Sequence, residues 1–95
     1  MISLHKLRKK TDQIDHKIIQ LIHQRQLLAP KFARLKQQHN LPLHQPKREQ
    51  VLLKKYHRQA QKLNLDKKIL EQIFRLLIKS SLQAQQKLSF IKNKL

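Results

Sequence analysis

The chain has 95 residues, with neither cysteine nor glycine, and carries 22 lysines and arginines against five acids, a formal net charge of +17. This length suits one domain with one core, so we expect residues 1–95 to form a single unit. Without cysteine there are no disulfides, thiol nucleophiles or cysteine-based zinc sites, and without glycine tight β-hairpin turns are disfavoured, so the expected fold class is all-α.

The apolar segments and the net charge limit the kinds of partner that the chain can have. The basic N-terminus is followed by no apolar segment of the signal-peptide type, and an apolar run such as Leu76-Leu77-Ile78 is far too short to span a bilayer. We therefore expect a cytoplasmic protein without membrane contact. The excess of positive charge favours anionic partners, which include nucleic acid, anionic lipid and small polycarboxylates, and does not choose among them.

The stretch from Leu4 to Lys36 predicts one long helix packed against other helices. Ser3 is the expected N-cap. Pro30 lies inside the pattern, and because the periodicity continues in phase beyond it, we predict a kink there, with a break into two helices at Ala29 as the alternative. Positions in steps of three and four are apolar except at Thr11 and Arg25; the series is Leu4, Leu7, Thr11, Ile14, Ile18, Leu21, Arg25, Leu28, Phe32 and Leu35.

Arg25 occupies a position in this apolar pattern where Leu or Ile is expected. A guanidinium cannot be buried among aliphatic side chains unless an anion meets it. Either a carboxylate of the helix bundle or a bound ligand must supply that anion. With five acids in the chain, an external anion is the favoured interpretation.

Residues 40–45 are expected to link the first helix to a second one. Pro46 suits the first position of the second helix, and Glu49 sits near its positive end. The buried stripe of this helix is predicted to contain Leu52, Leu53, Tyr56, Ala60 and Leu63.

A third helix is predicted to begin at Lys67, with Asp66 as its N-cap. Its apolar face is interrupted by Ser81 and Gln85, which lie one turn apart. These two side chains can therefore present a hydroxyl and a carboxamide to a common site.

The unequal helix lengths predict an intertwined homodimer of three-helix chains. A first helix ~50 Å long cannot be covered by two shorter ones, so its remaining surface must meet a second copy. Arg25 and Lys36 share one face, ~16 Å apart. Arg8 lies ~25 Å from Arg25 along the axis and is rotated off that face, so it can join the same site only from the partner chain.

Taken in order, the polar residues resemble the motif of the all-helical (AroQ-class) chorismate mutase family. The similarity covers Leu4 to about Leu88 and implies a chain that converts chorismate to prephenate in the shikimate pathway of aromatic amino acid biosynthesis. The residues that carry it are Leu7-Arg8, Ile14-Asp15, Arg25, Lys36, Pro46-x-Arg48-Glu49 and Ser81-x-x-x-Gln85.

The resemblance implies a clamp for the two carboxylates of chorismate. Arg25, Arg48 and Arg8 of the partner subunit would hold these carboxylates. Ser81 would line the site beside one of them.

The resemblance also implies roles for the residues on the ether and ring side of the substrate. Lys36 and Gln85 would face the ether oxygen of the breaking bond, and Glu49 would accept a hydrogen bond from the ring hydroxyl. Gln45 departs from the family pattern, because bacterial members often carry an acid there, near the same hydroxyl.

The implied rearrangement is unimolecular, so it requires no cofactor and no metal. None of the six histidines is paired at an i, i+4 spacing, which argues against a metal site. Two alternatives remain open: isochorismate pyruvate lyase on the same scaffold, and a basic helical nucleic-acid-binding protein. The second lacks stacking aromatics and a docking motif.

Overall fold

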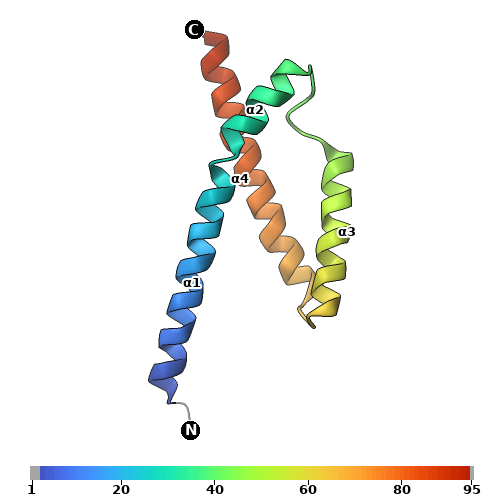
Figure 1. Ribbon diagram of the computed structural model, residues 1–95. Helices are drawn as coiled ribbons and strands as arrows, with labels where there is room; N and C mark the ends of the chain where they lie inside the picture. Colours follow the sequence, from blue (N-terminus) through green and yellow to red (C-terminus); the bar gives the residue numbers. More distant parts are fainter. Residues whose placement is uncertain (1–2, 95) are drawn as a thin grey trace.

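Three helical arms build the structure, and the first of them is bent (Figure 1). The computed structural model describes residues 3–94, and for residues 89–94 it describes the helical backbone alone. The described residues form no strand, which confirms the all-α prediction. The helices are α1 (Leu4–Gln26), α2 (Ala29–Gln38), α3 (Pro46–Lys62) and α4 (Lys67–Lys94).

Helices α1 and α2 are the two halves of the long predicted helix, joined at Leu27 and Leu28. Both joining residues keep right-handed helical dihedrals, with φ of −64° and −79°. The Leu28 amide bonds to the Arg25 carbonyl at 3.2 Å, one residue closer than in a regular α-helix. Pro30 has no amide hydrogen for the carbonyl of Gln26. The stretch is therefore bent just before the proline, as predicted. The regular hydrogen bonding is interrupted at the bend, so the second helix begins at Ala29, where the alternative placed a break.

The helix starts follow from local side-chain chemistry. The hydroxyl of Ser3 accepts a hydrogen bond of 3.2 Å from an amide in the first turn of α1. At the start of α4, Asp66 Oδ1 accepts from the amides of Lys68 and Ile69 at 2.9 and 3.2 Å. Both predicted N-caps are confirmed, and each satisfies amides that have no partner within the helix.

Helices α2 and α3 end in the same way, although the chain has no glycine. Asn40 and Asn64 adopt the left-handed conformation, with φ of 55° and 54°. The following amides, of Leu41 and Leu65, bond back to the last helical turn at 2.8 Å in both cases. Asparagine tolerates this conformation better than other residues with a Cβ, so it replaces the usual glycine.

The core is thin, and α4 is its centre, because both α2 and α3 pack against α4. The rings of Tyr56 and Phe74 stack between α3 and α4 with centroids 4.0 Å apart. Leu63, predicted to be buried, is 68% exposed because it caps the end of α3. Among the described side chains, the buried apolar residues are Ala29, Ala33, Leu53 and Ala60.

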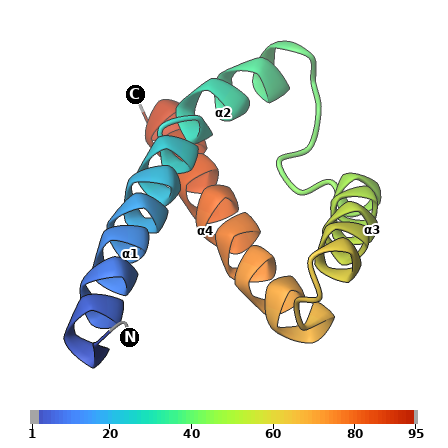
Figure 2. The same ribbon diagram turned by 60° about the horizontal axis from the view of Figure 1, so that its bottom comes forward.

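Helix α1 projects away from the rest of the chain and approaches α4 only near its C-terminal end (Figures 1 and 2). The radius of gyration is 17.3 Å, whereas a compact chain of this length would have about 12 Å. No residue of α1 is buried. Its apolar stripe is therefore uncovered in the single chain, at Leu4, Leu7, Ile14, Ile18 and Leu21.

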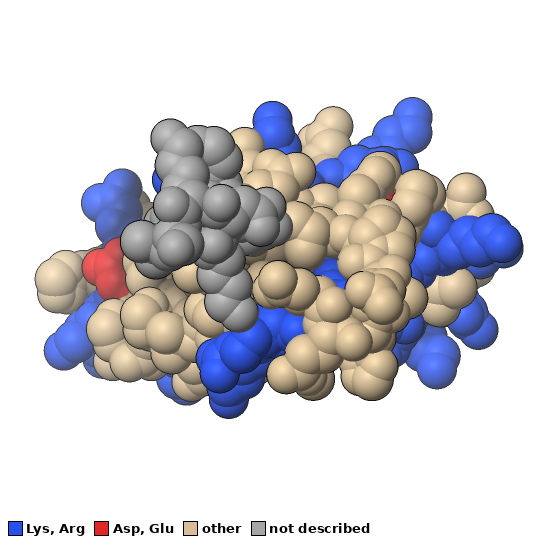
Figure 3. Space-filling model, turned by 90° about the horizontal axis from the view of Figure 1, so that it is seen from above, with Lys and Arg blue, Asp and Glu red and all other residues tan. Residues whose placement is uncertain are grey.

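Positive charge is spread widely over the surface. On the face drawn in Figure 3, lysine and arginine side chains appear at many separate places, and the acidic patches are small. No helix within residues 3–94 has both the length and the apolarity needed to cross a membrane.

The Asp66 cap generates a stability prediction. Asp66→Ala leaves two amides of α4 without their acceptor, so the free energy of unfolding should fall by about 1 kcal/mol. Urea denaturation followed by circular dichroism measures the change. Asp12→Ala, which removes an exposed acid from α1, is the control, and an equal loss in both variants would contradict the capping role.

Candidate functional site

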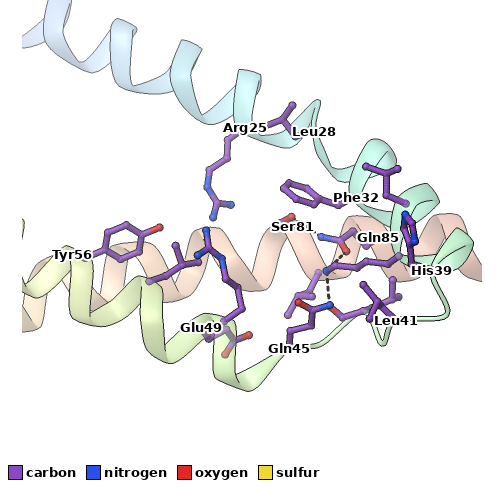
Figure 4. A pocket seen from close by; sticks show the side chains of 16 residues that line it. Arg25, Leu28, Phe32, His39, Leu41, Gln45, Glu49, Tyr56, Ser81 and Gln85 are labelled. Carbon is purple, nitrogen blue, oxygen red and sulfur yellow. Dashed lines mark hydrogen bonds between the residues drawn. The ribbon is translucent and has the colours of Figure 1, made fainter.

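A pocket of about 510 Å³ opens between the end of α1, α2, α3 and α4 (Figure 4). Arg8 does not line it, because this residue lies on the exposed N-terminal part of α1. The pocket brings together the other seven residues singled out from the sequence: Arg25, Lys36, Gln45, Arg48, Glu49, Ser81 and Gln85.

Lys36 is held in the pocket by neutral oxygen atoms. Its Nζ donates to Gln85 Oε1 at 2.8 Å and to the Leu43 carbonyl at 2.7 Å, and it lies 5.8 Å from the centre of the Phe32 ring. Burial lowers the pKa of Lys36 from its ordinary value of 10.5, because desolvation disfavours the ammonium. The contacts fix the position of the ammonium without neutralising its charge.

Gln85 connects Lys36 to the wall of the pocket. Gln85 is buried, with 3% of the residue exposed. While Oε1 accepts from Lys36, Nε2 donates to Ser81 Oγ at 3.0 Å. The prediction that Ser81 and Gln85 face one site is borne out by this geometry, and the orientation of the amide is set at both ends.

Arg25 reaches into the pocket from the last turn of α1 (Figure 4). Its Nη1 donates to the backbone carbonyl of Leu77 in α4 at 3.0 Å. Of the two sources of an anion considered from the sequence, a carboxylate of the bundle does not pair with this guanidinium among the described residues, and its partner is a neutral carbonyl. The external anion stays a prediction.

The α3 side of the pocket carries Gln45, Arg48 and Glu49. Glu49 Oε1 lies 3.2 Å from His44 Nε2, and the Gln45 amide donates to the Pro42 carbonyl at 3.4 Å. Glu49 is the only acid among the residues lining this pocket, against Arg25, Lys36 and Arg48. The pocket therefore carries a positive excess.

Three features of the pocket were missed by the sequence reasoning. The Leu43 carbonyl that accepts from Lys36 belongs to the backbone, and such a contact leaves no trace in residue type. His39 lines the pocket from the end of α2, and Tyr56 was expected in the α3 stripe without a role in a site. Helical spacing places Tyr56 on the same face as Leu52 and Glu49. That shared face could have indicated Tyr56 as a residue of the site.

These observations define an all-helical protein with a cationic pocket for a small anion. The guanidinium of Arg25, the ammonium of Lys36 and the carboxamide of Gln85 are each held by hydrogen bonds and come from different helices. Cationic groups held in this way favour the binding of carboxylates.

Comparison with known proteins identifies the family. Residues 7–86 match the family described as chorismate mutase type II, and the chain belongs to this family. It is 37% identical over 75 residues to a chorismate mutase from Methanocaldococcus jannaschii, which covers 79% of this chain and 76% of that protein.

Longer relatives contain a similar segment. The T-protein of Haemophilus influenzae is 29% identical over 90 residues, 95% of this chain and 24% of that protein. A bifunctional chorismate mutase/prephenate dehydratase from Aquifex aeolicus is 32% identical over 91 residues, 93% of this chain and 25% of that protein. The chain thus spans about a quarter of these two proteins.

The buried amide of Gln85 generates a second stability prediction. Gln85→Leu removes one acceptor of Lys36 and the donor to Ser81, so the free energy of unfolding should fall by about 1–2 kcal/mol. Urea denaturation measures this change. Gln72→Leu, at an exposed position of the same helix, is the control and should change stability by less than about 0.5 kcal/mol; a neutral Gln85→Leu would show that the amide contacts contribute nothing.

Proposed function

We propose that the 510 Å³ pocket binds chorismate and that its side chains drive rearrangement to prephenate. Membership of the chorismate mutase type II family over residues 7–86 supports this activity, which belongs to aromatic amino acid biosynthesis. The observation that carries the residue assignment is the contact of Lys36 Nζ with Gln85 Oε1 at 2.8 Å, in a pocket that also contains Arg25 and Arg48.

The reaction is an isomerisation, so the pocket has to hold and polarise the substrate without exchanging atoms with it. The ether C–O bond breaks while a new C–C bond forms within the same molecule. Negative charge grows on the ether oxygen in the transition state. Catalysis then comes from fixing the reactive conformer and from aiming donors at that oxygen.

Lys36 and Gln85 each keep a hydrogen for this purpose. An ammonium has three donors, and Lys36 uses two of them on Gln85 and Leu43. A carboxamide has two donors, and Gln85 uses one on Ser81. The remaining N–H groups are the proposed donors to the ether oxygen.

The two carboxylates of chorismate are assigned to the arginines. Arg25 uses one of its five N–H donors on Leu77, which leaves the others for a carboxylate. Arg48 supplies a second cation from α3, and Ser81 lies beside the carboxylate site. Glu49 is assigned to the ring hydroxyl, with Gln45 close to it.

The third cation of the clamp, Arg8, is assigned to a partner subunit in an intertwined homodimer. The support is the uncovered stripe of α1, where Leu4, Ile14 and Leu21 are all more than half exposed at 62%, 57% and 61%. Arg8 lies on the same projecting helix, so a partner's α1 that covers exposed apolar surface would also carry Arg8 to this pocket.

The activity is tested by following the ultraviolet absorbance of chorismate with purified protein and identifying the product. Prephenate is the expected product. Release of pyruvate and salicylate from isochorismate, without turnover of chorismate, would contradict the proposal.

Lys36→Ala should lower kcat about a thousandfold, because one preorganised donor to a developing oxyanion is worth ~3–4 kcal/mol. The measurement is steady-state turnover of chorismate. Lys31→Ala removes an exposed lysine from the same helix and should leave kcat unchanged. Near-normal turnover of Lys36→Ala would remove this residue from the mechanism.

Mixing two inactive variants tests whether Arg8 acts across subunits. In a heterodimer of Arg8→Ala and Lys36→Ala chains, one of the two sites has Arg8 from one chain and Lys36 from the other. Random pairing after unfolding and refolding of the mixture should restore about a quarter of wild-type turnover.

The matched control is a mixture of Arg25→Ala and Lys36→Ala chains, whose changed residues line the same pocket of one chain. Every site in that mixture lacks one group, so no turnover should return. If the Arg8 mixture also stays inactive while both variants refold, Arg8 does not act from the partner.

A further inference from the structure

Glu49 stands in the wall between two cavities. On one side it lines the 510 Å³ pocket, and on the other side it lines a second cavity of about 320 Å³ between α3 and α4. Cations line both cavities: Arg48 lines the first, and Arg75 and Lys79 of α4 line the second. The carboxylate of Glu49 therefore has competing attractions.

Arg75 is already engaged, because its Nη2 lies 3.0 Å from Glu71 Oε1. Lys79 is the α4 cation left to draw Glu49 towards the second cavity. In the structure the carboxylate of Glu49 instead contacts His44, whose Nε2 lies 3.2 Å from Glu49 Oε1.

His44 belongs to a linker that also fixes the other side of the pocket. The carbonyl of Leu43, the preceding residue, accepts from Lys36, and Gln45, the next residue, lines the pocket. The linker thus positions the ammonium of Lys36 and the carboxylate of Glu49 through neighbouring residues. Since His44 engages Oε1, the second oxygen of Glu49 can accept from a substrate.

We propose that His44 is a positioning residue that holds the Glu49 carboxylate at the wall of the 510 Å³ pocket, where the carboxylate accepts a hydrogen bond from the ring hydroxyl of the substrate. This inference rests on the proposed function. His44 does not touch the reacting bond, so its effect is on substrate binding, and it operates only through Glu49.

The chain offers a matched control, because a second histidine–glutamate pair lies outside the pocket. His57 Nε2 is 3.8 Å from Glu71 Oε1, and neither residue lines the 510 Å³ pocket. Loss of this pair tests what removal of a surface histidine contact does by itself.

The experiment measures kcat and KM for chorismate in full-length variants at neutral pH. His44→Leu should raise KM about three- to fivefold, the effect of one partly exposed pair, and leave kcat within twofold. His44→Gln, whose side-chain amide can replace the Nε2 donor, should restore KM. His57→Leu should have wild-type kinetics.

A double-mutant cycle decides whether His44 acts through Glu49. In a Glu49→Ala background, His44→Leu should produce no further change in KM. A wild-type KM in His44→Leu would overturn the proposal, and so would an equal rise in KM with and without Glu49, which would indicate a structural role of the linker.

An NMR measurement separates failure of this inference from failure of the proposed function. Long-range ¹H–¹⁵N spectra should show that His44 carries its proton on Nε2 and that Glu49→Ala shifts the His44 resonances without shifting those of His57. Unchanged His44 resonances would overturn the inference even in an active enzyme. Shifted resonances in a chain that does not turn over chorismate would place the failure in the proposed function.

Discussion

Lys36 connects helix α2 to the linker that follows it and to helix α4, which is distant in sequence. Its ammonium projects from α2 and donates to two neutral groups, the carbonyl of Leu43 in the linker and the carboxamide oxygen of Gln85 in α4. These two bonds keep the linker against α4 and so close one end of the pocket. Without the ammonium, this connection between the linker and α4 would be lost.

Two cations of the pocket have neutral hydrogen-bond partners within the chain. Lys36 meets a carbonyl and an amide, and Arg25 meets the backbone carbonyl of Leu77. A neutral acceptor fixes direction while leaving most of the electrostatic field available to a ligand. Glu49 is the one acid among the lining residues. Elsewhere in the chain, Glu71 pairs with Arg75, and Asp66 caps α4.

Features that depend on a few neighbouring residues could be predicted from the sequence. The caps at Ser3 and Asp66 are local hydrogen bonds, and the shared face of Ser81 and Gln85 follows from helical spacing. The partner of Arg25 could not be predicted, because any backbone carbonyl of another helix can accept from a guanidinium.

Features that depend on where a helix ends or on the path of a linker could not be predicted from local spacing. Leu63 continues the apolar spacing of α3, but the helix ends there and its side chain falls outside the packed face. The contact of His44 with Glu49 depends on the path of the linker, which residue types alone do not specify. Uncovered surface on the first helix was expected from the sequence on the basis of unequal helix lengths. In the structure α4, with 28 residues, is longer than α1, with 23, and α1 is uncovered because it approaches α4 only near its C-terminal end.

The bend between α1 and α2 separates two cations of the pocket. Arg25 lies just before it and Lys36 beyond it, so the angle at Leu27 and Leu28 sets how far apart their charged groups stand. A change at these joint residues would alter the spacing between the charges while every side chain that meets the ligand stayed the same. Substitutions at the bend could therefore change the size of the anion that fits the pocket without changing the side chains that bind it.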